Sequence, residues 1–330
     1  HRRLAHPTRR LMILQAAAAA SPPSDSSAVV VHNALFATLA VFTGIFLVVL
    51  VQGLRKRAAA GDTVKTPLSI WAVSFVANFF DTLGIGSYAT TTTMFRHWKL
   101  VRDERIPGTL NVGYVLPTVV QAFIYTTIVP VDPTTLILMI GSAVLGAWLG
   151  AGVVSGWSRR SVQLGMGLCL LGFVVIKVFS QLGIGPAAGM AVGLTGTKLA
   201  IGVVGNFVLG ALMTLGIGLY APCIILIGLL GMSPITAYPI MMGSCAFLMP
   251  MASVRFVRTG SFDPRAIIGM LLSGIPAVLI AAFIVKTMPL NIVMWLVLVV
   301  VTYTGVNMLL AARRERSIAS DATAAEAQPA

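Results

Sequence analysis

The chain has 330 residues, of which 57% are hydrophobic and 10% are charged, and its mean hydropathy is +0.91. A water-soluble globule of this length cannot bury so much apolar surface, so the composition predicts an all-α polytopic membrane protein. The net charge of +13 does not indicate nucleic-acid binding, because the basic residues cluster in short loops between apolar runs.

Residues 1–27 form an amino-terminal extension with a basic start, a short apolar run and a stretch of alanines. This pattern is similar to that of a signal peptide. Its four arginines would oppose the outward orientation that the topology below requires of the amino terminus. We therefore expect translation to start at Met12 and the residues before it not to be native.

Seven apolar stretches have the length of a transmembrane helix, about 20 residues. They are 29–54, 109–129, 134–154, 162–182, 235–257, 266–286 and 291–311. The first belongs to an extra helix, residues 28–54, ahead of the repeats described below. Two further apolar runs, 68–95 and 199–230, are each interrupted by the sequence TLGIG. They either cross as broken helices or enter the membrane and turn back.

The positions of lysine and arginine distinguish these two arrangements, since basic loops lie on the cytoplasmic side. The basic clusters are 55–65, 96–105, 159–160, 255–265 and 313–316. All of them share one side only if both interrupted runs turn back. The loops left outside are almost free of basic residues and lie near Val131, Gly185, Ser233 and Pro289. We therefore expect seven crossings and two re-entrant hairpins.

The chain also contains an internal repeat larger than TLGIG. The sequence 82–86 recurs at 214–218, Leu116-Pro117 recurs as Met249-Pro250, and Asp132-Pro133 recurs as Asp263-Pro264. The offsets are 132, 133 and 131 residues, a register that chance apolar similarity would not keep. Two units, 67–182 and 198–312, are predicted, each a re-entrant hairpin followed by three crossings. Because three is odd, the second unit is inverted in the membrane.

Inverted repeats with unwound segments at mid-depth are typical of secondary transporters, whose substrate site lies where the copies meet. Each TLGIG is predicted to be the turn of its hairpin near the midplane, where glycine permits sharp bends. The half-helices that follow would direct their N–H groups inward from both faces, which favours an anion. The predicted substrate-binding residues are Thr82, Gly84, Gly86, Ser87, Thr90, Thr214, Gly216, Gly218 and Tyr220. For Thr90, a hydrogen bond back to its own helix is the alternative.

Asp81 is the only acidic residue within the apolar spans, and is therefore a functional candidate. It is predicted either to couple proton and anion movement or to act as a helix cap or an ion-pair partner of Lys177 or Lys198. The second copy has Met213 at this position, which argues against a role that symmetry would require. Lys198, at the outer mouth of the second hairpin, either draws anions in or snorkels to the interface.

Enzyme and cofactor patterns are missing from the sequence: there is no phosphate loop, no HExxH motif and no pair of intramembrane aspartates. No catalytic residue, metal or cofactor is predicted, and we do not expect an enzyme. Cys169, Cys223 and Cys245 lie in apolar segments and are interpreted as buried thiols. The expected partners are a small anionic substrate and the lipid bilayer, without nucleic acid. The oligomeric state is left open, with a homodimer as one arrangement.

Several stretches resemble the sulfite exporter TauE/SafE family, also called the 4-toluene sulfonate uptake permeases. They are the duplicated glycine-rich turn, GTLNVGYVLPTVVQAFI, GAWLGAGVV and GALMTLGIGLYAPCIILIGLLGMSPITAYPIMMGSCAFLMP. The resemblance covers Ile70 to Leu310. It implies a secondary transporter that moves sulfite, sulfonates or related small anions across the cytoplasmic (inner) membrane, usually outward.

Other functions stay open beside a secondary anion exporter. They are an uptake permease, a gated anion channel with the same site, and a membrane component that carries sulfur groups on Cys223 or Cys245 to a partner enzyme. Residues 313–330 are rich in alanine and polar residues and predict a disordered cytoplasmic tail.

Overall fold

The computed structural model describes residues 26–62, 65–84, 86–149, 159–181, 189–213 and 218–326. This part of the chain is helical and holds no strand, only an isolated β-bridge between Ala191 and Met232. It contains six helices long and apolar enough to cross a membrane, at His32–Ala59, Arg160–Phe179, Gly196–Met213, Pro234–Thr259, Pro264–Ile284 and Trp295–Arg314. This architecture is compatible with the polytopic membrane protein that the composition predicts.

The helices follow the predicted apolar stretches along the chain. They are α2 (Ser26–Ala59), α3 (Leu68–Thr82), α4 (Ser87–His97), α5 (Ile106–Gly113), α6 (Val115–Ile128), α7 (Pro133–Leu149), α9 (Arg159–Gln181), α10 (Gly196–Met213), α11 (Tyr220–Leu229), α12 (Ala237–Thr259), α13 (Pro264–Thr287) and α14 (Leu290–Glu326). Short 3-10 turns at Asp103–Arg105 and Pro234–Thr236 precede α5 and α12.

Two predicted elements differ in the structure. The single helix expected over 109–129 is divided into α5 and α6, which meet at Tyr114. Pro117 accounts for this break, because it has no N–H to donate to the carbonyl of Gly113 and its ring crowds that group. At the other end of the chain, α14 continues to Glu326, through most of the segment predicted to be disordered. The alanines there have the highest helix propensity of any residue.

One end of the bundle holds both the start of α3 and the connection from α4 to α5. The N–H of Gly269 donates to Thr66 Oγ1 over 3.2 Å, immediately before α3. The N–H of Asp263 donates to Thr109 Oγ1 over 2.9 Å, after α4. Both contacts lie at the start of α13, so the α3–α4 pair leaves and returns to the same end, as expected of a hairpin.

The same end collects three of the five basic clusters. Arg57, at the end of α2, donates to the carbonyl of Phe262 over 3.5 Å, and its guanidinium lies 5.9 Å from the centre of that ring. Residues 55–62, 65–66, 96–109 and 255–265 therefore meet here, and we call this the basic end. The prediction that these clusters share one side agrees with this arrangement.

The opposite end is formed by residues 129–133, 189–198 and 231–236. The N–H of Asp132 donates to the carbonyl of Val192 over 2.9 Å, and the N–H of Ser233 donates to that of Ala191 over 3.0 Å. Helices α10 and α11 form a hairpin that starts and finishes here. A Cβ placed on Gly205 of α10 would lie 2.8 Å from Leu226 of α11.

Each helix that opens a predicted repeat runs alongside a helix of the other repeat. Helices α3 and α13 pack together and both run from the basic end. Helices α7 and α10 pack together and both run from the opposite end. Helix α6 packs against α12, and α9 packs against α14.

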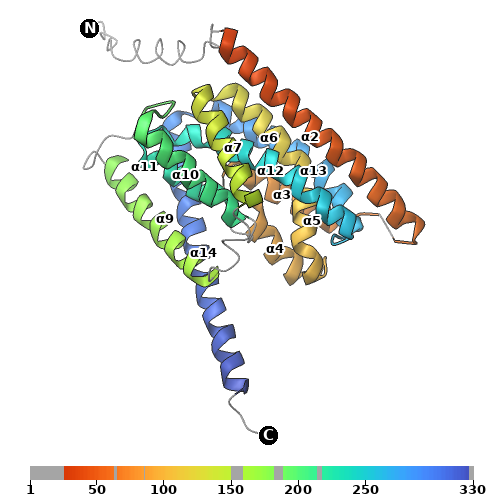
Figure 1. Ribbon diagram of the computed structural model, residues 1–330. Helices are drawn as coiled ribbons and strands as arrows, with labels where there is room; N and C mark the ends of the chain where they lie inside the picture. Colours follow the sequence, from red (N-terminus) through yellow and green to blue (C-terminus); the bar gives the residue numbers. More distant parts are fainter. Residues whose placement is uncertain are drawn as a thin grey trace, which may run out of the picture.

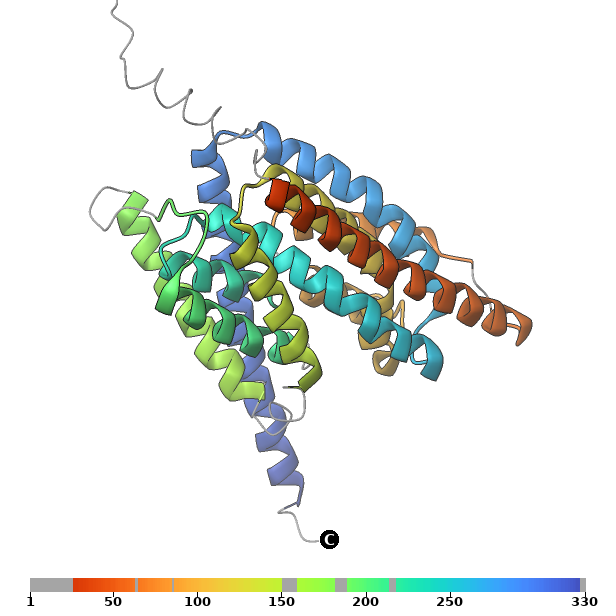
Figure 2. The ribbon, with the colours of Figure 1, turned by 45° about the horizontal axis from the view of Figure 1, so that its top comes forward.

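The outer surface of the bundle is apolar. Figures 1 and 2 show α2 along the outside of the bundle and the last turns of α14 projecting beyond it. Outward-facing side chains on α2, α9, α13 and α14 include Val41, Ile45, Val48, Leu168, Ile176, Leu279, Phe283, Val299 and Leu310. Such a surface suits contact with lipid chains rather than water.

Candidate functional site

The first glycine-rich turn lies in the interior of the bundle. Helix α3 ends at Thr82 and α4 begins at Ser87. Between them, Gly84 has a φ of 99° and Gly86 a φ of 80°, values that residues with a Cβ rarely adopt. The sharp bend therefore requires glycine at both positions, as the sequence predicts.

The carboxylate of Asp81 caps the helix that follows the turn. Its Oδ1 accepts a hydrogen bond from the N–H of Ser87 over 2.6 Å, although Asp81 belongs to the preceding helix. The side chain is only 4% exposed. A carboxylate at this position satisfies an N–H group of the first turn and complements the helix dipole. Of the structural alternatives considered for Asp81, the helix cap is the one present.

Gln121 of α6 connects this turn to the second hairpin. Its Nε2 donates to Asp81 Oδ2 over 3.0 Å and to Thr82 Oγ1 over 2.9 Å. Its Oε1 accepts a hydrogen bond from the Tyr220 hydroxyl over 3.1 Å. Tyr220 is the first residue of α11, so one buried amide joins the predicted sites of both repeats.

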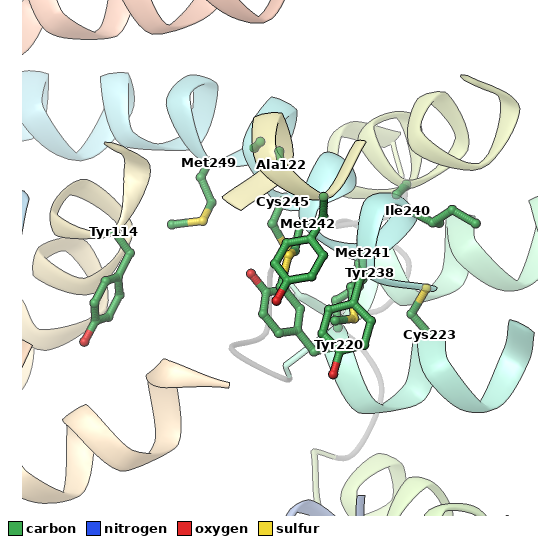
Figure 3. Packing of buried hydrophobic residues seen from close by; sticks show 14 of the residues in the cluster. Tyr114, Ala122, Tyr220, Cys223, Tyr238, Ile240, Met241, Met242, Cys245 and Met249 are labelled. Atoms are coloured by element: carbon green, nitrogen blue, oxygen red, sulfur yellow. The ribbon is translucent and has the colours of Figure 1, made fainter. Parts of the chain in front are cut away.

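Two tyrosines hold the carbonyl groups of the first turn. Tyr125 of α6 donates to the carbonyl of Thr82, and Tyr238 of α12 donates to that of Leu83, each over 3.0 Å. Their rings stack with centroids 5.0 Å apart. Figure 3 shows Tyr238 and Tyr220 in the same buried cluster as Cys245. Carbonyls that the turn leaves without helical partners are thus satisfied by fixed side chains.

The hydroxyls on the two sides of the first turn differ in their partners. At the end of α3, Thr82 donates to the carbonyl of Asn78 over 2.8 Å and accepts from Gln121, so its hydrogen is already used. In contrast, Tyr88 Oη and Thr90 Oγ1 are buried without a hydrogen-bond partner in the protein. Thr90 does not make the bond to its own helix that was the alternative for it. These two groups are donors still available beside the turn.

The second turn is described only in part, because Thr214 and Gly216 lie outside the described residues. Gly218 is exposed, has no unusual φ, and would have no atom within 4 Å of an added Cβ. Met213, which stands where the first copy has Asp81, contacts Cys245 with its sulfur 3.6 Å from the thiol. Met213 has no carboxylate, so the position equivalent to Asp81 cannot provide the same cap.

Lys198 does not join the turn residues. A Cβ on Gly231, just after α11, would lie 3.4 Å from Lys198 Nζ, whereas Tyr220 is at the other end of that helix. Lys177 also lies near this end, beside Gly228. Two ammonium groups thus complement the C-terminal dipole of α11. Neither lysine forms an ion pair with Asp81, whose carboxylate is bonded by the N–H of Ser87 and the amide of Gln121 and also interacts directly with the Tyr220 hydroxyl.

The three cysteines do not share one environment. Cys223 is 0% and Cys245 is 2% exposed, as predicted for buried thiols. Cys169 is instead exposed on the outer surface of α9, so that prediction was wrong for this residue. Among the residues that the structure describes, no group of three His, Cys, Asp or Glu side chains comes together as metal ligands do.

Sequence reasoning missed Gln121, Tyr125 and Tyr238. A glutamine within the apolar stretch 109–129 was a signal, because a buried amide there needs hydrogen-bond partners. The tyrosines gave no comparable signal, since aromatic residues are common in apolar helices. No protein-family model, curated protein or solved structure matches this chain.

Proposed function

We propose that this protein is a secondary transporter of small anions, with its site between the two glycine-rich turns. The observation that carries the proposal is the hydrogen-bonded bridge from Asp81 through Gln121 to Tyr220. It links the turn of a hairpin that starts at the basic end with the first residue of α11, in a hairpin that starts at the opposite end. Interrupted helices that meet in this way line the sites of many secondary transporters.

The proposal includes the inverted repeat, which the helix directions support. Helices α3 and α10 occupy equivalent positions in the two units, yet α3 runs from the basic end and α10 from the opposite end. If each helix is replaced by its counterpart in the other unit, the α3–α13 contact becomes the α10–α7 contact. The α6–α12 and α9–α14 contacts stay the same under this exchange, because each joins a helix to its own counterpart.

Individual contacts support the same relationship. Ser74 Oγ donates to the carbonyl of Met270 over 3.2 Å, and Asn206 Nδ2 donates to that of Met139 over 2.7 Å. Positions 74 and 206 are equivalent at the offset of 132, and Met139 and Met270 are equivalent at the offset of 131. The same side-chain-to-backbone bond thus occurs once in each half of the bundle.

The chemistry beside the first turn suits an oxyanion. The unpartnered hydroxyls of Tyr88 and Thr90 can donate hydrogen bonds without adding charge. Ionised Asp81 already occupies the N–H of Ser87 and repels an approaching anion, whereas a protonated Asp81 does not. Substrate binding is therefore expected to accompany proton binding at Asp81, which favours cotransport of a proton with the anion.

The substrate class and direction rest on the resemblance to the sulfite exporter family. Sulfite, sulfonates or related organic anions are the proposed substrates, and export across the cell inner membrane, driven by the outward gradient of the anion itself, is the proposed direction. We further propose that the basic end and the carboxyl terminus face the cytoplasm, because arginine and lysine gather there. The lipid bilayer is the permanent partner.

The sulfur-carrier function receives less support than transport. Cys223 and Cys245 are buried, and the thiol of Cys245 faces the thioether of Met213. A gated anion channel would use the same residues as a carrier. Only a coupled carrier can move an anion against its own gradient.

The first experiment is a screen of purified protein for thermal stabilisation by anions. Sulfite, 4-toluene sulfonate, sulfate, phosphate and chloride are compared at equal ionic strength. A bound ligand raises the apparent stability by RT ln(1 + [L]/Kd), so a true substrate should give a saturating increase in Tm. Hits are then tested for counterflow in proteoliposomes. If none of these anions is bound or exchanged, the proposed function is wrong.

A further inference from the structure

The side chain of Gln121 contacts two different elements of the site. Its side chain is 0% exposed, and both ends of its amide are engaged. The Nε2 end bonds Asp81 and Thr82 on α3, and the Oε1 end bonds Tyr220 on α11. These contacts are direct and 2.9 to 3.1 Å long.

The orientation of this amide depends on the charge of Asp81. An ionised carboxylate only accepts hydrogen bonds, so it requires the Nε2 end of Gln121. Oε1 then faces Tyr220, whose hydroxyl must donate. This is the arrangement in the structure.

A proton on Asp81 Oδ2 reverses each of these requirements. The carboxyl group becomes a donor, which favours rotation of the amide so that Oε1 faces Asp81. Nε2 then faces Tyr220 and donates to its oxygen. The Tyr220 hydroxyl no longer needs Gln121 as its acceptor, and its hydrogen becomes free for another partner.

We infer that Gln121 is a positioning residue that transmits the protonation state of Asp81 to Tyr220, so that a proton bound at the first turn frees a hydroxyl donor for the anion at the second. The inference rests on the proposed anion transport. It assigns proton coupling to a rotation of one buried amide, and it makes Tyr220 the group that binds substrate only after protonation.

Thr82 can follow the rotation. Its hydroxyl accepts from Nε2 in the present arrangement and donates to the carbonyl of Asn78. When Oε1 replaces Nε2, a rotation about the Cβ–Oγ bond lets the same hydroxyl donate to Gln121 instead. The reversed network therefore leaves no pair of acceptors facing one another.

The surroundings of Asp81 provide no competing charge. The titratable groups that interact with it are Tyr88 on α4, Tyr114 between α5 and α6, Tyr220 on α11 and Cys245 on α12. Helix α13, which packs along α3, has Arg265 at its start, and that arginine pairs with Asp263 at 2.9 Å. A proton on Asp81 thus changes the only formal charge among these groups.

The relay formed by Asp81, Gln121 and Tyr220 is present in one predicted repeat only. At the offsets of 132 and 133, the counterparts of Asp81 and Gln121 are Met213 and Val254, which can neither ionise nor rotate an amide. We therefore expect one coupling proton for each transport cycle.

The test that does not depend on substrate is infrared difference spectroscopy of the purified full chain during a pH titration. The protonated carboxyl band is assigned by its loss in Asp81→Asn, and the phenol band by its loss in Tyr220→Phe. In the wild type the two bands should change together. In Gln121→Leu the carboxyl band should still titrate while the phenol band loses most of its response, the remainder coming from the direct contact of Tyr220 with Asp81. Gln163→Leu removes another buried glutamine, on α9, and should behave as the wild type.

Two outcomes would overturn the relay. One is a phenol band that responds to pH in Gln121→Leu as strongly as in the wild type. The other is a wild-type carboxyl band that titrates without any phenol change, or that does not titrate while the protein stays folded. If Gln121→Leu does not fold, Gln121→Met, which also has no amide, takes its place with the same expected result and the same contradicting outcome.

A flux experiment separates failure of the relay from failure of the proposed function. In proteoliposomes with radiolabelled sulfite, Gln121→Leu should lose the acceleration of counterflow by a pH gradient, whereas the control Gln163→Leu should retain it. Acceleration at the wild-type level in Gln121→Leu would contradict the relay. If the wild type itself moves no sulfite or sulfonate, the transport proposal fails, and the infrared result still decides whether Gln121 couples Asp81 to Tyr220.

Discussion

The carboxylate of Asp81 accepts a hydrogen bond from the backbone N–H of Ser87 over 2.6 Å, and so caps the helix that follows its own turn. The N-terminus of α4 therefore already has an anionic partner from within the chain. The second turn has Met213 at the equivalent position and lacks this partner. The two turns are related by sequence but differ in charge, and this difference makes Asp81 the natural place for proton control.

The cap gives a direct prediction for stability. Asp81→Asn keeps an oxygen acceptor for the N–H of Ser87, whereas Asp81→Ala removes it and leaves a buried donor unpaired. We expect Asp81→Ala to be less stable than Asp81→Asn by about 1–2 kcal/mol. Thermal unfolding in detergent measures the difference. Equal stability of the two variants would mean that the bond to Ser87 does not stabilise α4.

The two glycine-rich turns should respond differently to alanine. Gly86 has a φ of 80°, so Gly86→Ala should cost about 1–3 kcal/mol and lower transport. Gly218 has no positive φ and open space around it, so Gly218→Ala should stay within about 0.5 kcal/mol of the wild type. Tm values and counterflow rates check both. A harmless Gly86→Ala would contradict the requirement for glycine in the first turn.

The close crossing of α7 and α10 should not tolerate a methyl group. A Cβ on Gly210 would clash with the carbonyl oxygen of Ala143. Gly210→Ala should therefore destabilise the protein by about 1–3 kcal/mol through forced separation of the helices. Gly172→Ala is the matched control, since no atom lies within 4 Å of its Cβ, and it should be neutral or stabilising.

Topology is tested by labelling of single cysteines with an impermeant reagent. Ala58→Cys and Arg102→Cys lie on exposed positions of the basic end, and Thr134→Cys lies on an exposed position beside the opposite end. Cys169 is exposed and is first replaced by serine. The first two sites should label from one side of the membrane and the third from the other. Labelling of Ala58→Cys and Arg102→Cys from different sides would remove the hairpin interpretation of α3 and α4.

Much of the fold followed from two elementary patterns. Apolar stretches of transmembrane length located most helices, and clustered arginine and lysine indicated that 55–66 and 96–109 share one end. The contacts of Thr66 and Thr109 with the start of α13 agree with that reasoning. The distribution of arginine and lysine among the loops predicts topology because its electrostatic basis is long-range and depends little on how side chains pack.

The site was predictable only in outline. The glycines of the first turn and Asp81 stood out because each violates the apolar pattern around it. Gln121 is different, since its partners Asp81 and Tyr220 lie 40 and 99 residues away along the chain. A single sequence carries no record of which helices meet, so a hydrogen bond between distant segments needs the packed structure. Helix α14 beyond residue 313 was missed because composition alone does not separate an alanine-rich helix from a disordered tail.

The most direct test of the account is the accumulation of radiolabelled sulfite in proteoliposomes under an imposed pH gradient, with sulfite initially equal on both sides. Cotransport with a proton predicts accumulation on the alkaline side, above the starting concentration, by the wild type. It also predicts that Asp81→Asn still exchanges sulfite at equal pH but does not accumulate it. Exchange without accumulation by the wild type would indicate a channel or an uncoupled carrier, and accumulation by Asp81→Asn at the wild-type level would contradict the coupling role of Asp81.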